Sequence, residues 1–173
     1  MEVWIITVIA VAACCFLCCC LPCMCNSCMS SSYRRKMKQE FESKSLLCET
    51  KYGTVEYSIS KPSGDIAGYV LCMNGTPGFH DGYNRGFDAL VEKGFCVVAP
   101  SRPNYGRTKL TNDWKKAQEA ADGLAALMEE LKIDSYAVFA ASGGGPQTCH
   151  LALKYPDRVK CLILDGAITG GLR

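Results

Sequence analysis

Residues 138–146 read Val138-Phe139-Ala140-Ala141-Ser142-Gly143-Gly144-Gly145-Pro146, and this stretch constrains the fold more than any other. Four apolar residues lead into a serine among small residues, and residues 147–155 are compatible with a helix. A buried strand, a tight turn and a helix in this order form a nucleophile elbow, which lifts the serine oxygen clear of a sheet. The N–H of the next residue then faces an oxyanion. We therefore interpret Ser142 as a nucleophile rather than an ordinary turn serine.

Length, composition and charge limit the other interpretations. The chain has 173 residues, 49% of them hydrophobic, and a formal net charge of +2. This length is enough for one domain. The basic residues are scattered apart from one short cluster, so we expect no nucleic-acid partner. No internal repeat is visible.

The N-terminal segment is predicted to be a membrane anchor. Val3–Leu21 carries no charge, and a helix of this length spans about 28 Å, close to the roughly 30 Å of a bilayer's hydrocarbon core. Pro22 ends the run, and basic residues follow from Arg34 to Lys38. Positive charge on this flank predicts a single-pass protein whose C-terminal part lies in the cytosol. A cleaved signal peptide is the less favoured alternative, because no basic residue precedes the apolar run.

Eight of the 13 cysteines lie between Cys14 and Cys28. Cysteines at the cytosolic edge of an anchor are acceptors for S-acylation, so palmitoylation and contact with membrane lipid are one interpretation. An equally weighted interpretation is that cysteine is a small apolar filler in the anchor. The pairs Cys20-x-x-Cys23 and Cys25-x-x-Cys28 have ligand-like spacing, but they adjoin the apolar run, so a metal site is disfavoured and no cofactor is expected.

From about residue 46 the pattern alternates between strands and helices. Apolar or alternating runs predict strands at residues 54–60, 69–73, 95–99, 136–140 and 159–164. Helical spacing predicts helices at residues 81–93, 112–131 and 147–155. Such alternation is typical of a mostly parallel sheet with helices on both faces. We divide the chain into an anchor with its cysteine cluster (1–28), a juxtamembrane linker (29–45) and an α/β domain (46–173).

The loop Asn74-Gly75-Thr76-Pro77-Gly78 follows a predicted strand directly. In α/β sheets this is the edge at which binding sites form. Glycine lets the backbone approach a ligand closely, and proline stiffens the turn. The N–H of Thr76 is therefore a candidate oxyanion donor beside that of Gly143. An ordinary strand–helix turn is the alternative interpretation.

Four blocks in order resemble the α/β-hydrolase fold superfamily of serine hydrolase type. The loop at 74–78 resembles the family's His-Gly-x-Pro-Gly, and residues 99–108 resemble its Asp-Arg-Pro-Gly-Tyr-Gly-x-Ser stretch. Residues 140–144 resemble the elbow, and residues 155–159 resemble the turn into the next strand. The resemblance covers about residues 52–171 and implies the first two-thirds of the fold. It implies Ser142 as nucleophile, with Thr76 and Gly143 as the oxyanion hole.

The chain also departs from the family pattern. Asn74 replaces a histidine, Ser101 replaces an aspartate and Asn104 replaces a glycine, which leaves the local turn geometry open. The family's acid and histidine follow the serine in sequence. After Ser142 the only histidine is His150, which is interpreted as a helix-face residue.

Three further residues bear on the roles of catalytic base and acid. His80 precedes the elbow and is interpreted as a loop or substrate-pocket residue. Asp165 is a candidate acid at a strand end, although a turn role is favoured. Asp157 belongs to a Pro-Asp-Arg turn.

The sequence therefore predicts an α/β-hydrolase fold that is incomplete at the C-terminus and preceded by one transmembrane helix. The catalytic acid and histidine are expected beyond Arg173. The first hypothesis is a membrane-anchored serine hydrolase acting on an ester, amide or related acyl bond of a small molecule. The second is a non-catalytic, hydrolase-like binding or scaffold protein. An enzyme of dehalogenase or epoxide-hydrolase type is disfavoured, because those enzymes carry a carboxylate where this chain has Ser142.

Overall fold

The computed structural model describes residues 31–33, 35–36, 38–81, 87–109, 111 and 116–169. It divides into two compact units, Met1–Ser43 and Lys44–Arg173. The second unit contains the sheet and the candidate site.

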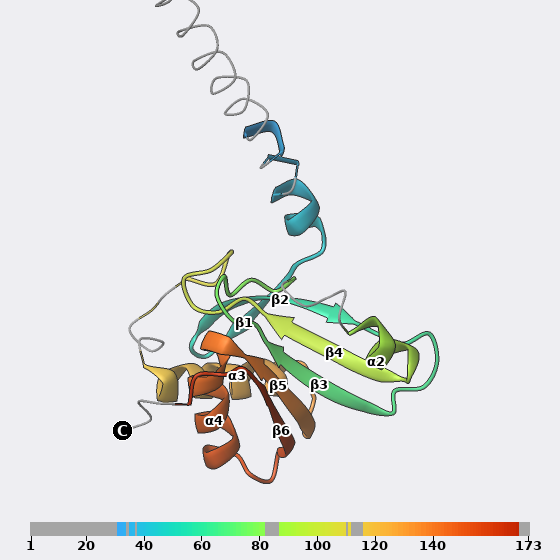
Figure 1. The fold of residues 1–173 in the computed structure, drawn as a ribbon, viewed down its shortest axis with the longest axis vertical. Coiled ribbons are helices and arrows are strands. Elements are labelled where there is room, and N and C mark those ends of the chain that lie inside the picture. The colour runs from blue at the N-terminus through green and yellow to red at the C-terminus, as the bar shows by residue number, and fades with distance from the viewer. Residues whose placement is uncertain are drawn as a thin grey trace, which may run out of the picture. The chain divides into compact units, whose positions relative to one another are not determined.

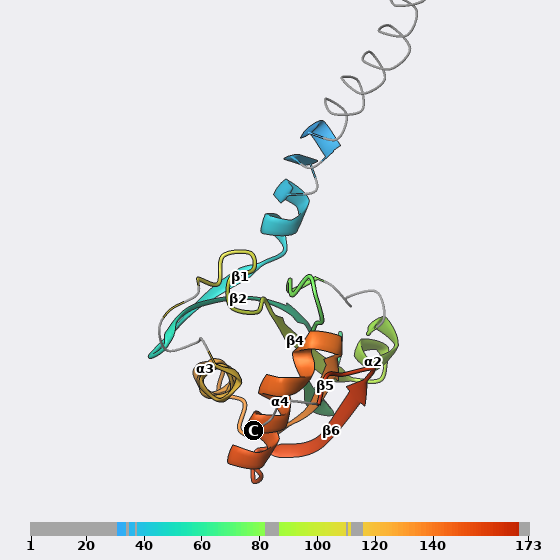
Figure 2. The ribbon, with the colours of Figure 1, turned by 60° about the vertical axis from the view of Figure 1, so that its left-hand side comes forward.

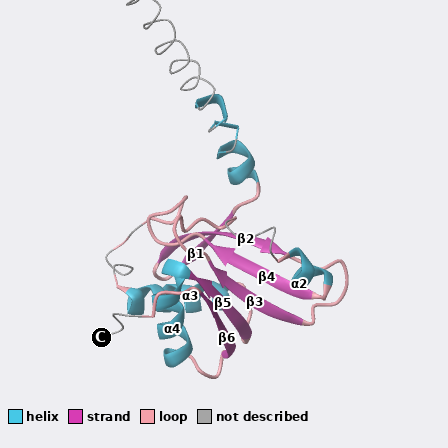
Figure 3. Ribbon diagram, viewed as in Figure 1, coloured by secondary structure: helices cyan, strands magenta, loops and turns pink. Residues whose placement is uncertain are grey.

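The described elements of the second unit alternate between strands and helices after two initial strands (Figures 1 and 3). Their order is β1 (Leu46–Thr50), β2 (Gly53–Ser60), β3 (Gly68–Met73), α2 (Asp88–Glu92), β4 (Phe95–Pro100), α3 (Ala117–Glu130), β5 (Tyr136–Ala141), the 3-10 turn η3 (Ser142–Gly144), α4 (Gly145–Lys154) and β6 (Val159–Asp165).

These strands form a six-stranded sheet within the described residues, in the order β1-β2-β4-β3-β5-β6. The β1–β2 and β2–β4 pairs are antiparallel, and the other three pairs are parallel. Leu71 of β3 is in register with Val98 of β4 on one side and Val138 of β5 on the other. The predicted parallel sheet is therefore confirmed for β3 to β6.

Helices cover both faces of the sheet, as Figures 1 and 2 show. Leu71 and Met73 of β3 join the core cluster that contains residues of α3 and α4. Val70 and Cys72, which alternate with them, join Phe87 and the partly buried Leu90 and Val91 of α2 in a second cluster. Successive side chains of a strand point to opposite faces, so α2 lies on one face and α3 with α4 on the other.

Helix α3 supplies most of the core on its face. Its buried positions include the apolar run from Leu124 to Met128. The Arg158 guanidinium donates hydrogen bonds to three carbonyl oxygens near the end of this helix, those of Ala125, Ile133 and Asp134. These bonds connect the turn before β6 with α3 and with the segment between α3 and β5. They explain why an arginine stands in the turn before β6.

The structure corrects several predicted boundaries. Strand β1 was not predicted, although all five of its residues pair with β2. The helix predicted from residue 112 begins at Ala117, because Lys116 has an extended backbone (φ −107°, ψ 157°). The helix predicted from residue 81 begins at Asp88 in the described part of the chain. The strands predicted at 69–73, 95–99, 136–140 and 159–164 are confirmed as β3 to β6.

In the first unit, the described residues between 31 and 43 are helical. An ion pair of 3.7 Å between Lys38 and Glu42 supports this helix at i, i+4 spacing. The predicted anchor Val3–Leu21 and the cysteines from Cys14 to Cys28 lie outside the described residues. Within the residues that are described, no helix combines the length and the apolar character needed to cross a bilayer.

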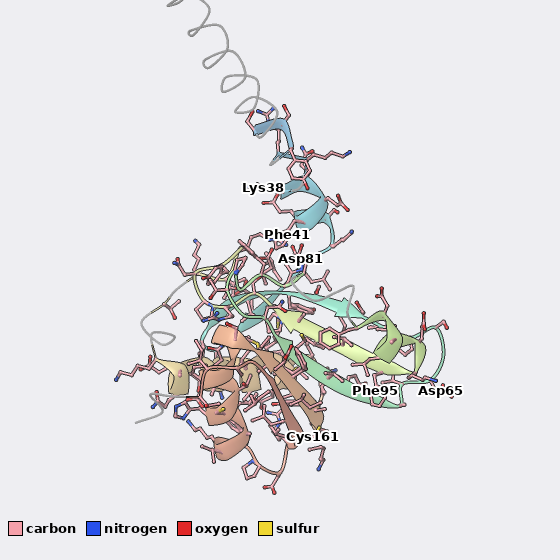
Figure 4. All side chains as sticks on the ribbon, in the orientation of Figure 1. Lys38, Phe41, Asp65, Asp81, Phe95 and Cys161 are labelled. Carbon is pink, nitrogen blue, oxygen red and sulfur yellow. The ribbon has the colours of Figure 1, made fainter. Side chains whose placement is uncertain are left out.

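The five described cysteines are free thiols. Cys72, Cys96 and Cys149 are buried, and Cys48 is partly buried. Figure 4 shows Cys161 on β6, where its side chain is exposed. The three buried thiols therefore act as small apolar residues of the core.

Candidate functional site

The candidate site lies where two neighbouring parallel strands end. The loop after β3 leads towards α2 and the turn after β5 leads into α4, and these helices lie on opposite faces of the sheet. Connections that diverge in this way leave a crevice at the carboxyl ends of the strands. The topology thus brings the loop at residues 74–78 next to Ser142.

Ser142 lies in the strand–turn–helix arrangement that the sequence predicts. It follows β5 directly, begins η3 and precedes α4. Its φ of 45° is in the left-handed region, which non-glycine residues rarely adopt and which costs of order 1–3 kcal/mol. Ser142 is exposed, whereas the preceding Ala141 is buried. The turn therefore holds the hydroxyl at the surface, at the sheet edge.

The 74–78 loop packs directly on this turn. A Cβ built on Gly75 would lie 2.8 Å from the Ser142 Cβ and 3.5 Å from its Oγ. Any side chain at position 75 would therefore push the loop away from the serine. Asn74, which replaces the family's histidine, is buried, and its Nδ2 donates a hydrogen bond to the carbonyl oxygen of Phe79. The substitution preserves a polar side chain that closes the loop.

The two candidate oxyanion donors lie close to each other. A Cβ built on Gly143 would lie 3.3 Å from the Thr76 Oγ1. Gly143 is the second residue of η3, where a helix has no internal acceptor for the backbone N–H. Thr76 is exposed. The structure thus brings Thr76, Gly143 and Ser142 together, and their roles stay predictions.

Arg102 is a part of the site that sequence reasoning did not single out. Its Nη1 donates hydrogen bonds to the carbonyl oxygen of Gly75 at 3.2 Å and to Thr76 Oγ1 at 3.4 Å. Its backbone N–H donates to the carbonyl oxygen of Gly78 at 2.7 Å. Burial lowers the pKa of the guanidinium, although the neighbouring Tyr105 hydroxyl acts in the opposite direction. One arginine therefore fixes both ends of the 74–78 loop.

A second arginine, Arg107, belongs to a polar cluster around the buried Glu56 side chain. The Glu56 side chain is wholly buried, and its Oε1 pairs with Arg107 Nε at 2.9 Å. The Glu56 carboxylate also accepts hydrogen bonds from Ser45 Oγ at 2.8 Å and Ser101 Oγ at 3.0 Å. Ser101 stands where the family has an aspartate, and its hydroxyl bonds to the Glu56 carboxylate from β2.

The cluster also determines the charge of Glu56. Burial by itself raises the pKa of this carboxyl group. Hydrogen bonds from the Arg107 backbone and side chain, and from Ser45 and Ser101, outweigh burial and lower the pKa below its ordinary value.

Asn104, which replaces a glycine, has a φ of 70°, a conformation that asparagine tolerates better than most residues. Both departures from the family pattern are therefore accommodated.

Neither histidine hydrogen-bonds to Ser142 in the described part of the chain. His80 is wholly buried, its backbone N–H donates to Ser101 Oγ and its carbonyl oxygen accepts from Ser58 Oγ, and its interpretation as a loop or substrate-pocket residue stays a prediction. His150 lies within α4, and no hydrogen bond in the described part of the chain joins it to Ser142.

The predicted acids occupy different positions. Asp165 ends β6 opposite Ala141, at the same sheet edge as the serine, but it is exposed. Asp157 lies in the turn before β6, as predicted. Of the two, only Asp165 is near the elbow.

Comparison with known proteins supports the same fold. A family model described as alpha/beta hydrolase fold matches residues 68–170. The uncharacterized hydrolase YcgS of Bacillus subtilis is 38% identical over 118 residues, which cover 68% of this chain and 39% of that protein. A 2-hydroxy-6-oxononadienedioate/2-hydroxy-6-oxononatrienedioate hydrolase of Escherichia coli is 31% identical over 91 residues, covering 52% of this chain and 32% of the relative.

Solved structures give the same result. An alpha/beta hydrolase fold protein from Nakamurella multipartita is 31% identical, with a TM-score of 0.65. The match covers 72% of this chain and 41% of that structure's chain. This chain therefore spans less than half the length of each of the three similar proteins.

Proposed function

This chain belongs to the α/β-hydrolase fold family, and we propose that it contributes a serine nucleophile to a membrane-anchored hydrolase of acyl bonds. The observation that carries the proposal is the backbone of Ser142, an exposed serine with φ 45° between β5 and α4. Backbone strain of this kind persists only where the surroundings impose it, and it is frequent at active sites. Here β5, α4 and the adjacent Gly75 impose it.

The proposed reaction is acyl transfer through a covalent intermediate. Ser142 Oγ attacks the carbonyl carbon, and the backbone N–H groups of Thr76 and Gly143 stabilise the resulting oxyanion. The alcohol or amine then leaves, and water hydrolyses the acyl-enzyme. The general base is proposed to lie outside the described residues, because neither described histidine hydrogen-bonds to Ser142. Asp165 is kept as a candidate acid on its position alone.

The nucleophile is tested with a fluorophosphonate probe, which labels activated serines. A chain extended through any coding sequence that follows Arg173 is expected to be labelled at Ser142 and to hydrolyse short-chain esters. Ser142→Ala should abolish both, and Ser63→Ala, at an exposed turn serine, should change neither. Loss of one triad member reduces turnover by about 10⁴–10⁶-fold, so residues 1–173 alone should be nearly inactive.

A non-catalytic binding protein is the second candidate, and the placement of His80 and His150 favours it. Absence of labelling and turnover in both the extended and the given chain would establish this alternative. Robust Ser142-dependent turnover by residues 1–173 alone would instead show that one of these histidines reaches the serine.

The membrane part of the proposal rests on the sequence. The apolar run Val3–Leu21 and the basic flank after it predict a domain that stays in the cytosol. A glycosylation acceptor appended after Arg173 should remain unmodified in a secretory-membrane assay, and efficient modification would reverse the orientation.

Acylation of the cysteine cluster is tested separately. Hydroxylamine-sensitive acyl exchange should label the chain, and replacing the six cysteines from Cys18 to Cys28 by serine should abolish the label. Both forms should resist carbonate extraction, because the apolar run is unchanged. An unlabelled wild-type chain would support the alternative that these cysteines are apolar filler.

A further inference from the structure

Arg102 places a positive charge at the candidate site without a negative partner in the described part of the chain. Its Nη1 bonds only to the neutral acceptors Gly75 O and Thr76 Oγ1. Its Nε is buried and has no hydrogen-bond partner among the described residues. The ion pairs of the described residues involve Lys38, Arg107 and Lys154 and not Arg102. A partly desolvated cation in such a setting is stabilised when an anion binds to it.

The guanidinium lies beside the residue that follows the serine. A Cβ built on Gly143 would be 2.9 Å from Arg102 Nη1 and 3.6 Å from its Cζ. The Arg102 guanidinium lies over the Tyr105 ring, with 5.7 Å between Cζ and the ring centroid. Ser142 and Thr76 beside it are exposed.

We propose that Arg102 binds a carboxylate group of the substrate whose acyl bond Ser142 attacks. This inference rests on the proposed function and names the substrate class: esters or related acyl compounds that carry a free carboxylate. A carboxylate accepts charge-assisted hydrogen bonds from a guanidinium. It also carries one negative charge, which a single guanidinium neutralises. A phosphate monoester carries about −1.5 to −2 and would leave excess negative charge beside the site of the oxyanion.

The test compares two ligands that differ in one charge. Isothermal titration calorimetry of the full chain in non-ionic detergent measures binding of monomethyl glutarate, which has a free carboxylate, and of the neutral dimethyl glutarate. The wild type should prefer the monoester. Arg102→Met keeps an apolar stem but removes the charge, and it should weaken monoester binding about 10- to 100-fold while leaving the diester unchanged. Lys109→Met, which removes an exposed charge from the same loop, should retain the preference.

Each other outcome contradicts the inference. Equal weakening of both esters by Arg102→Met would mean that the arginine serves only to hold the loop. A wild type without preference would mean that no carboxylate site exists, and tighter binding of inorganic phosphate would assign the site to another anion. Should circular dichroism show that Arg102→Met is unfolded, Arg102→Lys replaces it and should lose several-fold affinity for the monoester alone. Calorimetry reads carboxylate binding whether or not Ser142 is labelled, so failure of the two proposals is distinguishable.

Discussion

Arg102 and Arg107 both lie on the loop that follows β4, but in opposite electrostatic surroundings. Arg107 pairs with the buried Glu56 and also donates to the backbone and side chain of Ser45. Arg102 donates to one carbonyl and one hydroxyl beside the exposed Ser142. A buried ion pair with satisfied hydrogen bonds fixes a structure, whereas a charge without a counter-ion fits a ligand site. The comparison predicts that Arg107 governs stability and Arg102 governs binding.

The largest effect is expected at Glu56. Glu56→Gln removes the charge that Arg107 pairs with and should lower the free energy of unfolding by about 2–3 kcal/mol. This is less than the roughly 3–5 kcal/mol for a wholly buried pair, because the Arg107 side chain is partly exposed. Urea unfolding of the full chain in detergent measures it. Glu49→Gln, at an exposed position of β1, is the matched control, and equal stability of the two variants would contradict the assignment.

A substitution at Gly106, which lies against Glu56 in the same cluster, should also lower the free energy of unfolding. Gly106 has a φ of 55°, and a Cβ on it would overlap Glu56 Oε2. Gly106→Ala should therefore destabilise the chain by about 2 kcal/mol, from left-handed strain together with displacement of the carboxylate. Gly64→Ala, where a Cβ meets nothing within 4 Å, should change stability much less. Combining Gly106→Ala with Glu56→Gln should cost less than the sum of the two, because both damage the same contact.

Acidification should weaken the same cluster. The pKa of Glu56 is lower in the folded chain than in the unfolded chain. The contribution of Glu56 to the free energy of unfolding is therefore fully present above its pKa in the unfolded chain, about 4.3. It is lost as the pH falls through the pKa of the folded chain. Each pKa unit of lowering corresponds to about 1.4 kcal/mol. Hydrogen bonds from Lys154 and Tyr155 lower the pKa of Asp122 against the effect of burial, which adds a contribution of the same sign.

The measurement compares urea unfolding of the wild type and Glu56→Gln between pH 6 and pH 3. Their difference isolates Glu56 from Asp122 and should shrink towards acid pH. A difference that stays constant over this range would mean that folding does not lower the pKa of Glu56.

The smallest effect on stability is expected at Arg102. Arg102→Met should change the free energy of unfolding by less than about 1 kcal/mol, because its apolar stem still packs on Gly78 and no ion pair within the described residues is broken. Thermal unfolding followed by circular dichroism measures this. A decrease in the free energy of unfolding as large as that of Glu56→Gln would show that Arg102 and Arg107 contribute similarly to stability.

Much of the fold was predictable, and the unpredicted parts have physical reasons. Strands β3 to β5 are continuous apolar runs, as buried parallel strands are. Strand β6 is mostly exposed, but it still contains an apolar run at residues 161–164. Strand β1 has the mostly exposed pattern of an edge strand, so its sequence carries no comparable signal. The start of α3 at Ala117 depends on the extended Lys116, which no helix-breaking residue marks.

The candidate site also has parts that the sequence predicted and parts that it did not. Ser142, Gly75 and Gly143 were found because each belongs to a short motif with a characteristic order. The pairing of Glu56 with Ser101 joins positions that are 45 residues apart, and local patterns do not report such contacts. The replacement of an aspartate by Ser101 marks the position as unusual, but it does not indicate which residue bonds to the serine.

Under the N-terminal anchoring proposed above, the bonds to Ser45 have a mechanical consequence. Ser45 immediately precedes β1, and Arg107 and Glu56 hold its carbonyl and hydroxyl groups. Tension transmitted along the chain from residue 43 meets this clamp before it reaches the first residue pair of β1 and β2, Leu46 and Tyr57. These bonds therefore protect the β1–β2 hairpin at the sheet edge from the load. Without them, its residue pairs would separate one after another.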